Sequence, residues 1–280
     1  MTLQQCLQVG EARLLGGPHP DRARRDAELL LLHVARMERA ALLAHRSEGL
    51  SAATAVRFLA LVARRLAGEP VQYIVGETEF YGLPFQVTRD VLIPRPETEH
   101  LVEKCIELAG RFEHPRLVDV GAGSGAIAVA LAHKLPQAQI TSIDLSAEAL
   151  EICQENARRN GVVVRFLRGD LLAPVAAESF EIVVSNPPYV PTADRAGLAV
   201  EVRDYEPELA LFAGEDGLDV YRRLIPEARA VLVPGGFLAL EIGFGQSAGI
   251  GELLGASGFE QIDFVPDLQG IPRVACGRRR

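Results

Sequence analysis

The sequence has few cysteines, and none stands where a disulfide framework or a metal site would need it. Cys6, Cys105, Cys153 and Cys276 are scattered along 280 residues without a C-x-x-C pair, and the six histidines lack metal-ligand spacing. We therefore expect no metal, and a reducing cytoplasm as the location. Long apolar runs are also missing. None reaches the length of a membrane span, and the polar N-terminus does not resemble a signal peptide.

Basic clusters are scarce in most of the chain. Residues 1–70 carry 10 Lys and Arg against 7 Asp and Glu, whereas the remaining residues carry 19 against 30. The net charge is thus +3 in the first part and −11 in the rest. Because contacts to phosphates dominate nucleic-acid affinity, this balance argues against duplex DNA as a substrate and predicts no stable nucleic-acid partner. Arg278–Arg280 is expected to be a solvated tail, and a monomer is the default oligomeric state.

Three parts follow one another along the chain. Apolar residues recur at intervals of three and four over residues 1–75, which predicts a small helical bundle with Asp21 and Ser51 as N-caps. This bundle either recognises a macromolecular substrate or only packs. Residues 76–95 predict a β-hairpin linker. Residues 96–280 predict a Rossmann-like domain, because strand and helix patterns alternate there.

The predicted fold class of the large domain is α/β. Its seven strands are expected near 116–120, 139–143, 163–167, 180–185, 236–242, 259–265 and 271–276, and its helices near 96–108, 125–134, 146–160, 218–231 and up to about 256. Alternation predicts a mostly parallel sheet with right-handed crossovers. The last two strands lack a helix between them, so they should form an antiparallel hairpin. Pro96 suits the first turn of the first helix.

A glycine-rich segment, Gly121-Ala122-Gly123-Ser124-Gly125, follows the first strand of this domain. Its glycines allow a tight turn and a close approach of the backbone to a ligand at a helix N-terminus. Asp144 ends the next strand, where a carboxylate can bind both hydroxyls of a ribose. The pattern Gly121-x-Gly123-x-x-Ala126 also matches the dinucleotide fingerprint, so NAD remains an alternative cofactor.

Two acidic residues favour a different cofactor. Asp119 precedes the glycines and gives D-x-G-x-G-x-G, which resembles motif I of class I methyltransferases. Asp170 and Leu171 follow the third strand, where that class places an acidic contact to the adenine amine and an apolar wall for its ring. The resemblance implies S-adenosylmethionine as cofactor and S-adenosylhomocysteine as product. The implied cofactor-binding residues are Gly121, Ala122, Gly123, Ser124, Gly125, Asp144, Asp170, Leu171 and Asn186.

The segment Asn186-Pro187-Pro188-Tyr189 ends the strand predicted at 180–185. Two prolines stop the ladder, so nearby carbonyls lack a sheet partner and can accept other hydrogen bonds. With an amide and an aromatic ring beside them, these groups suit a planar NH2 group, either a base amine or a carboxamide. We expect Asn186 Oδ1 and the Pro187 carbonyl to accept its two hydrogens. Pro188 would hold the turn and Tyr189 would stack on the acceptor, and no general base is required. Taken alone, the tetrapeptide is better explained as a proline-rich strand exit with a structural tyrosine, and the glycine-rich segment upstream reverses that preference.

Together these segments resemble the PrmC/HemK family, protein-(glutamine-N5) methyltransferases of peptide chain release factors. The resemblance covers nearly the whole chain and rests on Glu69–Gly76, Leu92–Glu99, Asp119–Gly125, Asn186–Tyr189, Tyr205–Pro207 with Ala210 and Leu211, and Glu241–Gly245. It implies methyl transfer to the side-chain amide nitrogen of the glutamine in the Gly-Gly-Gln tripeptide of release factors. Leu171 departs from the aromatic residue that some members carry, which implies weaker stacking on adenine.

Three alternatives remain beside this interpretation. An adenine-N6 methyltransferase acting on DNA or RNA would use the same Asn186–Tyr189 tetrapeptide, but the acidic charge balance opposes it. An NAD(P) oxidoreductase would use the glycine-rich segment. A non-catalytic module that has kept the fold would not need both Asn186 and Asp144.

Overall fold

The computed structural model describes residues 1–280 and contains two compact units. The first unit joins Met1–Glu77 with Leu198–Tyr205, and the second joins Thr78–Gly197 with Glu206–Arg280. The chain therefore leaves the second unit after Gly197, contributes a short segment to the first, and returns. No helix is long and apolar enough to cross a membrane.

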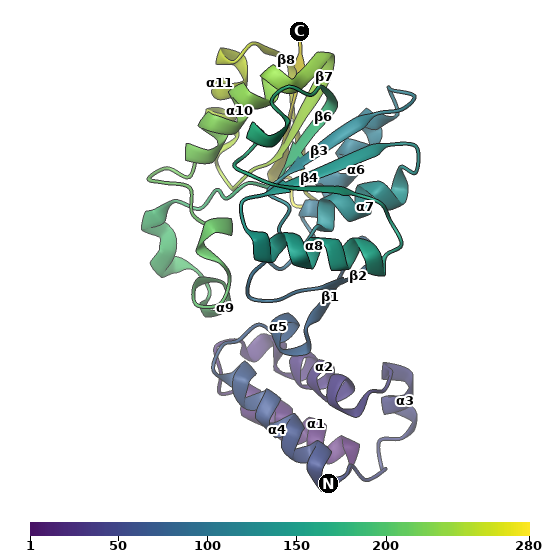
Figure 1. The fold of residues 1–280 in the computed structure, drawn as a ribbon. Coiled ribbons are helices and arrows are strands. Elements are labelled where there is room, and N and C mark those ends of the chain that lie inside the picture. The colour runs from purple at the N-terminus through teal and green to yellow at the C-terminus, as the bar shows by residue number, and fades with distance from the viewer. The chain divides into compact units, whose positions relative to one another are not determined.

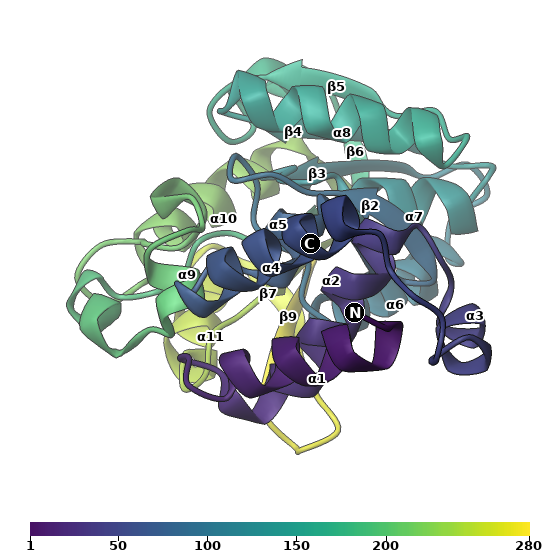
Figure 2. The same ribbon diagram turned by 90° about the horizontal axis from the view of Figure 1, so that it is seen from below.

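The first unit is a helical bundle. Its helices are α1 (Leu3–Leu14), α2 (Ala23–Ala35), α3 (Arg39–Ala44), α4 (Ala52–Leu66), α5 (Val71–Val75) and α9 (Val200–Arg203), with a 3-10 turn at Pro20–Arg22. Helices α1, α2 and α4 pack against one another (Figures 1 and 2). Leu30, Leu31, Phe58 and Val62 are fully buried between them. The predicted bundle is thus present, stabilised by apolar side chains at helical spacing.

Only one of the two predicted N-caps of this bundle is found. The Ser51 hydroxyl accepts a hydrogen bond from the Thr54 backbone N–H at the start of α4. Asp21 lies in the preceding 3-10 turn instead, and Arg22 is the N-cap of α2 without a side-chain bond. The prediction for Asp21 was wrong because Pro20 starts a separate short turn before the helix.

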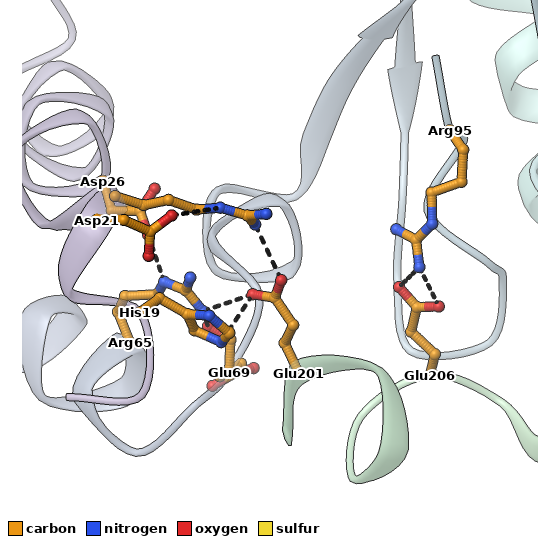
Figure 3. Close-up of polar contacts among 9 residues, drawn as sticks. His19, Asp21, Asp26, Arg65, Glu69, Arg95, Glu201 and Glu206 are labelled. Atoms are coloured by element: carbon orange, nitrogen blue, oxygen red, sulfur yellow. Dashed lines mark hydrogen bonds and ion pairs between the residues drawn. The ribbon is translucent and has the colours of Figure 1, made fainter. Parts of the chain in front are cut away.

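A buried ion cluster joins the short segment 198–205 to the helices of the first unit (Figure 3). The side chain of Arg65 is 2% exposed. Its Nε donates to Asp26 Oδ2 at 2.6 Å, and its Nη1 donates to the Glu69 carbonyl at 3.1 Å. The same Nη1 lies 2.9 Å from Glu201 Oε2 of α9. One guanidinium thus binds groups from three parts of this unit, as its fan of donors allows.

The second unit contains two sheets. The smaller one pairs β1 (Glu77–Phe80) with β2 (Leu83–Gln86), so the segment predicted as a separate hairpin linker forms, apart from its start up to Glu77, part of this unit. The larger one has the order β5-β4-β3-β6-β7-β9-β8. Its strands are β3 (Arg116–Val120), β4 (Gln139–Asp144), β5 (Arg165–Arg168), β6 (Phe180–Ser185), β7 (Leu232–Glu241), β8 (Phe259–Pro266) and β9 (Pro272–Arg279). The first five run parallel, and β9 pairs antiparallel with both β7 and β8. The predicted parallel sheet with an antiparallel ending is confirmed.

Helices cover both faces of the large sheet (Figure 1). They are α6 (Thr98–Ala109), α7 (Ala126–Lys134) and α8 (Ala147–Arg159) on one face, and α10 (Asp219–Val231) and α11 (Ser247–Ala256) on the other. Strand β6 illustrates the arrangement, because Ile182 and Val184 pack into one apolar core and Val183 into the other. Burial on both faces explains why this strand is a continuous apolar run.

Two boundary predictions at the two ends of the large domain were wrong. Helix α6 begins at Thr98 with Glu97 as its N-cap, so Pro96 lies just before the helix and not in its first turn. Strand β9 continues to Arg279, which pairs with Phe259, so the expected solvated tail at Arg278–Arg280 is mostly sheet. Arginines can extend an edge pairing because their long side chains reach solvent or acidic partners.

Candidate active site

A cavity of about 470 Å³ lies at the carboxyl ends of β3, β4 and β6. Ligands bind at this edge of open parallel sheets because the strand-to-helix loops gather there. Among the predicted site residues, those lining the cavity are Gly121, Ala122, Gly123, Ser124, Asp144, Asp170, Leu171, Asn186 and Pro188. Gly125, Pro187 and Tyr189 are not among the lining residues. The structure thus brings the two predicted halves of the site, the glycine-rich segment and Asn186, to one cavity.

The glycine-rich segment takes a backbone conformation that side chains disfavour. The φ angles of Gly121, Gly123 and Gly125 are +83°, +53° and +81°. Gly125 is the N-cap of α7, and a Cβ placed on it would lie 3.3 Å from the Cys153 Cα of α8. A side chain at Gly125 would therefore press α7 away from α8, whereas Gly121 and Gly123 shape the cavity wall.

Asp144 fastens the glycine-rich segment to the end of β4. Its Oδ2 accepts a hydrogen bond from the Gly123 N–H at 2.9 Å, and its Oδ1 accepts one from the Ser146 N–H at 2.8 Å. Each carboxylate oxygen has a second lone pair, so both can still accept from a ligand hydroxyl. This geometry suits the ribose contact predicted for Asp144.

A second carboxyl group lies beneath the same segment. Asp119 is completely buried, and its Oδ2 accepts a hydrogen bond from the Ser142 hydroxyl at 2.9 Å while Oδ1 has no partner. Burial, with a smaller contribution from the charge of Asp144, raises the pKa of Asp119 to about 7. The carboxylate of Asp144, which lines the cavity, creates a negative potential there that favours a cationic ligand. A sulfonium cofactor with an amino group has this character.

The residues predicted to contact adenine also line the cavity. Leu171 has a φ of +47°, a conformation that is rare for a branched side chain and marks a constrained position. Asp170 Oδ2 accepts a hydrogen bond from Arg223 Nη2 at 2.5 Å. The sequence pattern did not indicate Arg223, which is another lining residue. An adenine amine at Asp170 would therefore meet a carboxylate that is already paired on one oxygen.

Asn186 is held by a chain of hydrogen bonds that the sequence pattern did not indicate. Its Nδ2 donates to Thr98 Oγ1 at 3.2 Å, and the Thr98 hydroxyl donates to Glu241 Oε2 at 2.6 Å. Thr98 and Glu241 are 4% and 3% exposed. Burial raises the pKa of Glu241 to about 7. Both residues lie within segments that carry the family resemblance. The sequence therefore marked these segments, but it did not indicate that the two side chains hold Asn186.

Tyr189 lies beside the cavity and not on its wall. Burial, together with the nearby charge of Glu241, raises the pKa of Tyr189 to about 12. Its carbonyl accepts a hydrogen bond from Gln246 Nε2 at 3.0 Å, and a Cβ on Gly243 would lie 3.0 Å from its ring. The Tyr189 ring is thus packed tightly against Gly243, and the hydrogen bond from Gln246 holds its carbonyl, so the end of the tetrapeptide is fixed.

The chain that follows Tyr189 returns to the cavity. Leu209, Ala210 and Phe212 line it, and the Val190 N–H donates to the Leu211 carbonyl at 2.8 Å. Within this second unit, Arg95 Nη2 donates to both carboxylate oxygens of Glu206, at 2.7 and 2.6 Å (Figure 3). The Glu206 side chain is 1% exposed. This ion pair, in which the carboxylate is buried and the guanidinium is partly exposed, fixes the point at which the chain re-enters the unit.

The sheet order, its antiparallel ending, and the glycine-rich and acidic strand ends define a class I methyltransferase fold. Residues 98–201 match a family model described as methyltransferase small domain, and residues 5–76 match one described as PrmC N-terminal domain. In fold, the chain is similar to the Thermus thermophilus 16S rRNA N2 G1207 methyltransferase, solved with AdoMet and guanosine. That match has a TM-score of 0.55 at 20% identity, over 73% of this chain and 50% of the other.

Sequence comparison gives the family. A release factor glutamine methyltransferase of Moorella thermoacetica is 45% identical over 283 residues, which cover 100% of this chain and 99% of the relative. One of Koribacter versatilis is 42% identical over 280 residues, with the same coverage. The chain belongs to the release factor glutamine methyltransferase family. The family and the fold imply S-adenosylmethionine as the methyl donor.

Proposed function

We propose that this protein transfers a methyl group from S-adenosylmethionine to the side-chain amide nitrogen (N5) of the glutamine in the Gly-Gly-Gln tripeptide of peptide chain release factors. The observation that carries the proposal is the placement of Asn186. It lines the cavity, and its Nδ2 is bound to Thr98, which leaves Oδ1 for an acceptor N–H. Membership of the family supports release factors as the partner.

The donor is proposed to lie along the glycine-rich segment. Gly121, Gly123 and Ser124 would pass under it, and Asp144 would accept from its ribose hydroxyls. Leu171 would cover the adenine ring, and Asp170 would contact the adenine amine beside Arg223. Gly125 contributes indirectly, through the position of α7. When bound, the donor supplies an electrophilic methyl group on a sulfonium.

The residues of the chain would make a poor nucleophile reactive by aligning it. The lone pair of an amide nitrogen is delocalised into its carbonyl. Asn186 Oδ1 and the Pro187 carbonyl are proposed to accept its two N–H hydrogens and thereby direct the nitrogen toward the methyl group. Positive charge that develops on the nitrogen strengthens both bonds, so they stabilise the transition state more than the bound substrate. Pro188 would hold the turn in which these acceptors lie. Tyr189 was expected to stack on the acceptor amide, but it does not line the cavity, so its proposed role here is also to hold the turn.

An adenine-N6 methyltransferase is the second candidate, because a base amine presents the same two hydrogens to Asn186. The net charge of −11 over residues 71–280 opposes a nucleic-acid substrate. The two candidate functions therefore differ only in the group that receives the methyl, which is a glutamine amide in one and an adenine amine in the other.

The decisive test is transfer of labelled methyl from S-adenosylmethionine to purified release factor, beside a Gly-Gly-Ala variant of that factor and duplex DNA. We expect label on the intact factor and none on the other two. Asn186→Ala should slow transfer by about 10²–10³-fold. Gln137→Ala, which changes an exposed amide that does not line the cavity, is the matched control and should retain full activity. Label on DNA alone would refute the proposed substrate, and full activity of Asn186→Ala would refute the role of Asn186.

A further inference from the structure

Three structural elements converge on the side chain of Asn186. Asn186 follows β6, Thr98 is the first residue of α6, and Glu241 is the last residue of β7. They form one chain of hydrogen bonds, with 3.2 Å from Asn186 Nδ2 to Thr98 Oγ1 and 2.6 Å from Thr98 Oγ1 to Glu241 Oε2. Tyr221 adds support, because its hydroxyl donates to the Glu241 carbonyl at 2.7 Å.

The chemistry of these groups fixes the direction of the chain. An ionised carboxylate can only accept, so the Thr98 hydroxyl must give its single proton to Glu241. Its oxygen can then only accept from Asn186. The Asn186 amide must therefore turn its NH2 group toward Thr98, which points Oδ1 the opposite way. If the amide were flipped, its NH2 group would face the NH2 group of the substrate glutamine. Both groups are donors, so no hydrogen bond would form between them.

We propose that Thr98 and Glu241 are positioning residues that hold the Asn186 amide with its oxygen toward the acceptor nitrogen. This inference rests on the function proposed above and adds two residues to it. Neither residue touches the reacting atoms, and both act through Asn186. The arrangement also accounts for a buried carboxylate that would otherwise only destabilise the fold.

Protonation of Glu241 would remove this control. A neutral carboxyl group carries its own O–H donor, so the Thr98 hydroxyl is free to turn and both amide orientations become possible. The pKa of Glu241 is raised to about 7 by burial and by the charge of Glu97. The hydrogen bond from Thr98, the nearby Asn186 amide and the charge of Arg273 oppose the increase. Activity should therefore fall as the pH drops through about 7.

The other ionisable groups facing Glu241 do not produce the same pH profile. The side chains of Tyr189 and Tyr221 lie near it, but their pKa values are raised by burial, to about 12 for Tyr189 and well above the ordinary value for Tyr221. Both remain neutral near pH 7. The pKa of Asp119 is also raised to about 7, but this residue lies under the glycine-rich segment that is proposed to bind S-adenosylmethionine. Its effect should appear in the affinity for S-adenosylmethionine, so turnover is measured with that donor saturating.

The test compares five variants, including Asn186→Ala as the reference, by kcat with release factor at saturating donor, and by the Kd for S-adenosylmethionine. Glu241→Gln and Thr98→Val should each lower kcat by about 10–100-fold and change the donor Kd less than about twofold. Thr98→Ser keeps the hydroxyl and should restore kcat. The double variant Thr98→Val with Asn186→Ala should be no slower than Asn186→Ala alone, because Thr98 acts only through Asn186. The acidic limb near pH 7 should disappear in Glu241→Gln.

Three outcomes would overturn the inference. One is a wild-type kcat and pH profile in Glu241→Gln or Thr98→Val while Asn186→Ala is slow. The second is a Thr98→Ser variant as slow as Thr98→Val, and the third is additive loss in the double variant. If Glu241→Gln fails to fold, the two Thr98 variants decide the matter. Failure of the wild-type protein to methylate release factor would instead refute the proposed function, so the two failures are distinguishable.

Discussion

Replacing Arg65 with methionine would remove the cation that binds Asp26 and Glu201 inside the helical unit. The lost contacts are 2.6 Å from Arg65 Nε to Asp26 Oδ2 and 2.9 Å from Nη1 to Glu201 Oε2. Asp26 is only 3% exposed and the Glu201 side chain 17%, so neither carboxylate gains full hydration in exchange. Removing one partner of a buried ion pair costs about 3–5 kcal/mol. We expect a loss of this size in the free energy of unfolding of the first unit.

The assay must resolve one unit of a two-unit chain. The chain contains no tryptophan, so urea unfolding is followed by far-ultraviolet circular dichroism, and hydrogen exchange reports on residues 198–205 separately. Arg39→Met is the matched control, because its ion pair with Glu28 is mostly exposed on the arginine side and should contribute below about 1 kcal/mol. Replacing Asp26 with leucine in the Arg65→Met background should recover part of the stability. Equal unfolding midpoints and equal exchange of residues 198–205 in Arg65→Met and the control would refute the reasoning.

Two further predictions concern the cofactor side of the cavity. Asp144→Ala should weaken binding of S-adenosylmethionine by about 1.5–3 kcal/mol, because a charged hydrogen-bond acceptor and the anchor of Gly123 are lost together. An equilibrium titration measures this affinity, and an unchanged value would contradict the role of Asp144. Gly125→Ala should lower the stability of the second unit by about 1–2 kcal/mol, because its φ is +81° and the new Cβ would press on Cys153. Thermal unfolding measures it against Gly161→Ala in the same unit, where φ is +65° but the new Cβ would meet no neighbour within 4 Å, and equal losses in the two variants would rule out the packing role.

Local sequence patterns predicted the elements of this fold well, because the physical cause of each element lies within it. Strand β6 was found from an apolar β-branched run, and both of its faces are buried. The start of β7 was expected at residue 236 but lies at Leu232. The prediction failed because Pro234, Gly235 and Gly236 are residues that usually end a strand. The irregular pairing between Phe180 and Ile182 lies opposite this stretch. A glycine-rich strand start depends on its neighbour more than on its own residues.

Contacts distant in sequence could not be predicted in this way. Thr98 contacts Asn186 across 88 positions and Glu241 across 143 positions, and Arg223 reaches Asp170 across 53. Each residue alone is explained by its own element, Thr98 as the start of a helix and Glu241 as the end of a strand. Only the strand order, which places β6 beside both β3 and β7, brings them together. The chemistry of the acceptor site is therefore a property of the sheet order as much as of its motif.

The segment between Tyr189 and α10 is anchored separately in each unit. Within the second unit, the Val190 carbonyl accepts from the Ala213 N–H at 3.0 Å, and the buried Glu206 pairs with Arg95. Within the first unit, Glu201 of the same segment binds Arg65. Each anchor is a contact within its own unit, and the covalent chain connects one anchor to the next.

Separate anchors predict separate functional effects. A change at Glu201 reaches the second unit along the chain through Glu206, whose side chain is held by Arg95. Asn186 is held by Thr98, and Thr98 by Glu241, and neither bond depends on the Arg65 cluster. If the helical unit recognises the release factor, loss of the Arg65 cluster should raise the KM for that substrate and leave kcat nearly unchanged, whereas loss of the hydrogen-bond chain should lower kcat. Steady-state kinetics with release factor as the varied substrate measure both, and a lower kcat with an unchanged KM in Arg65→Met would contradict this division between the two units.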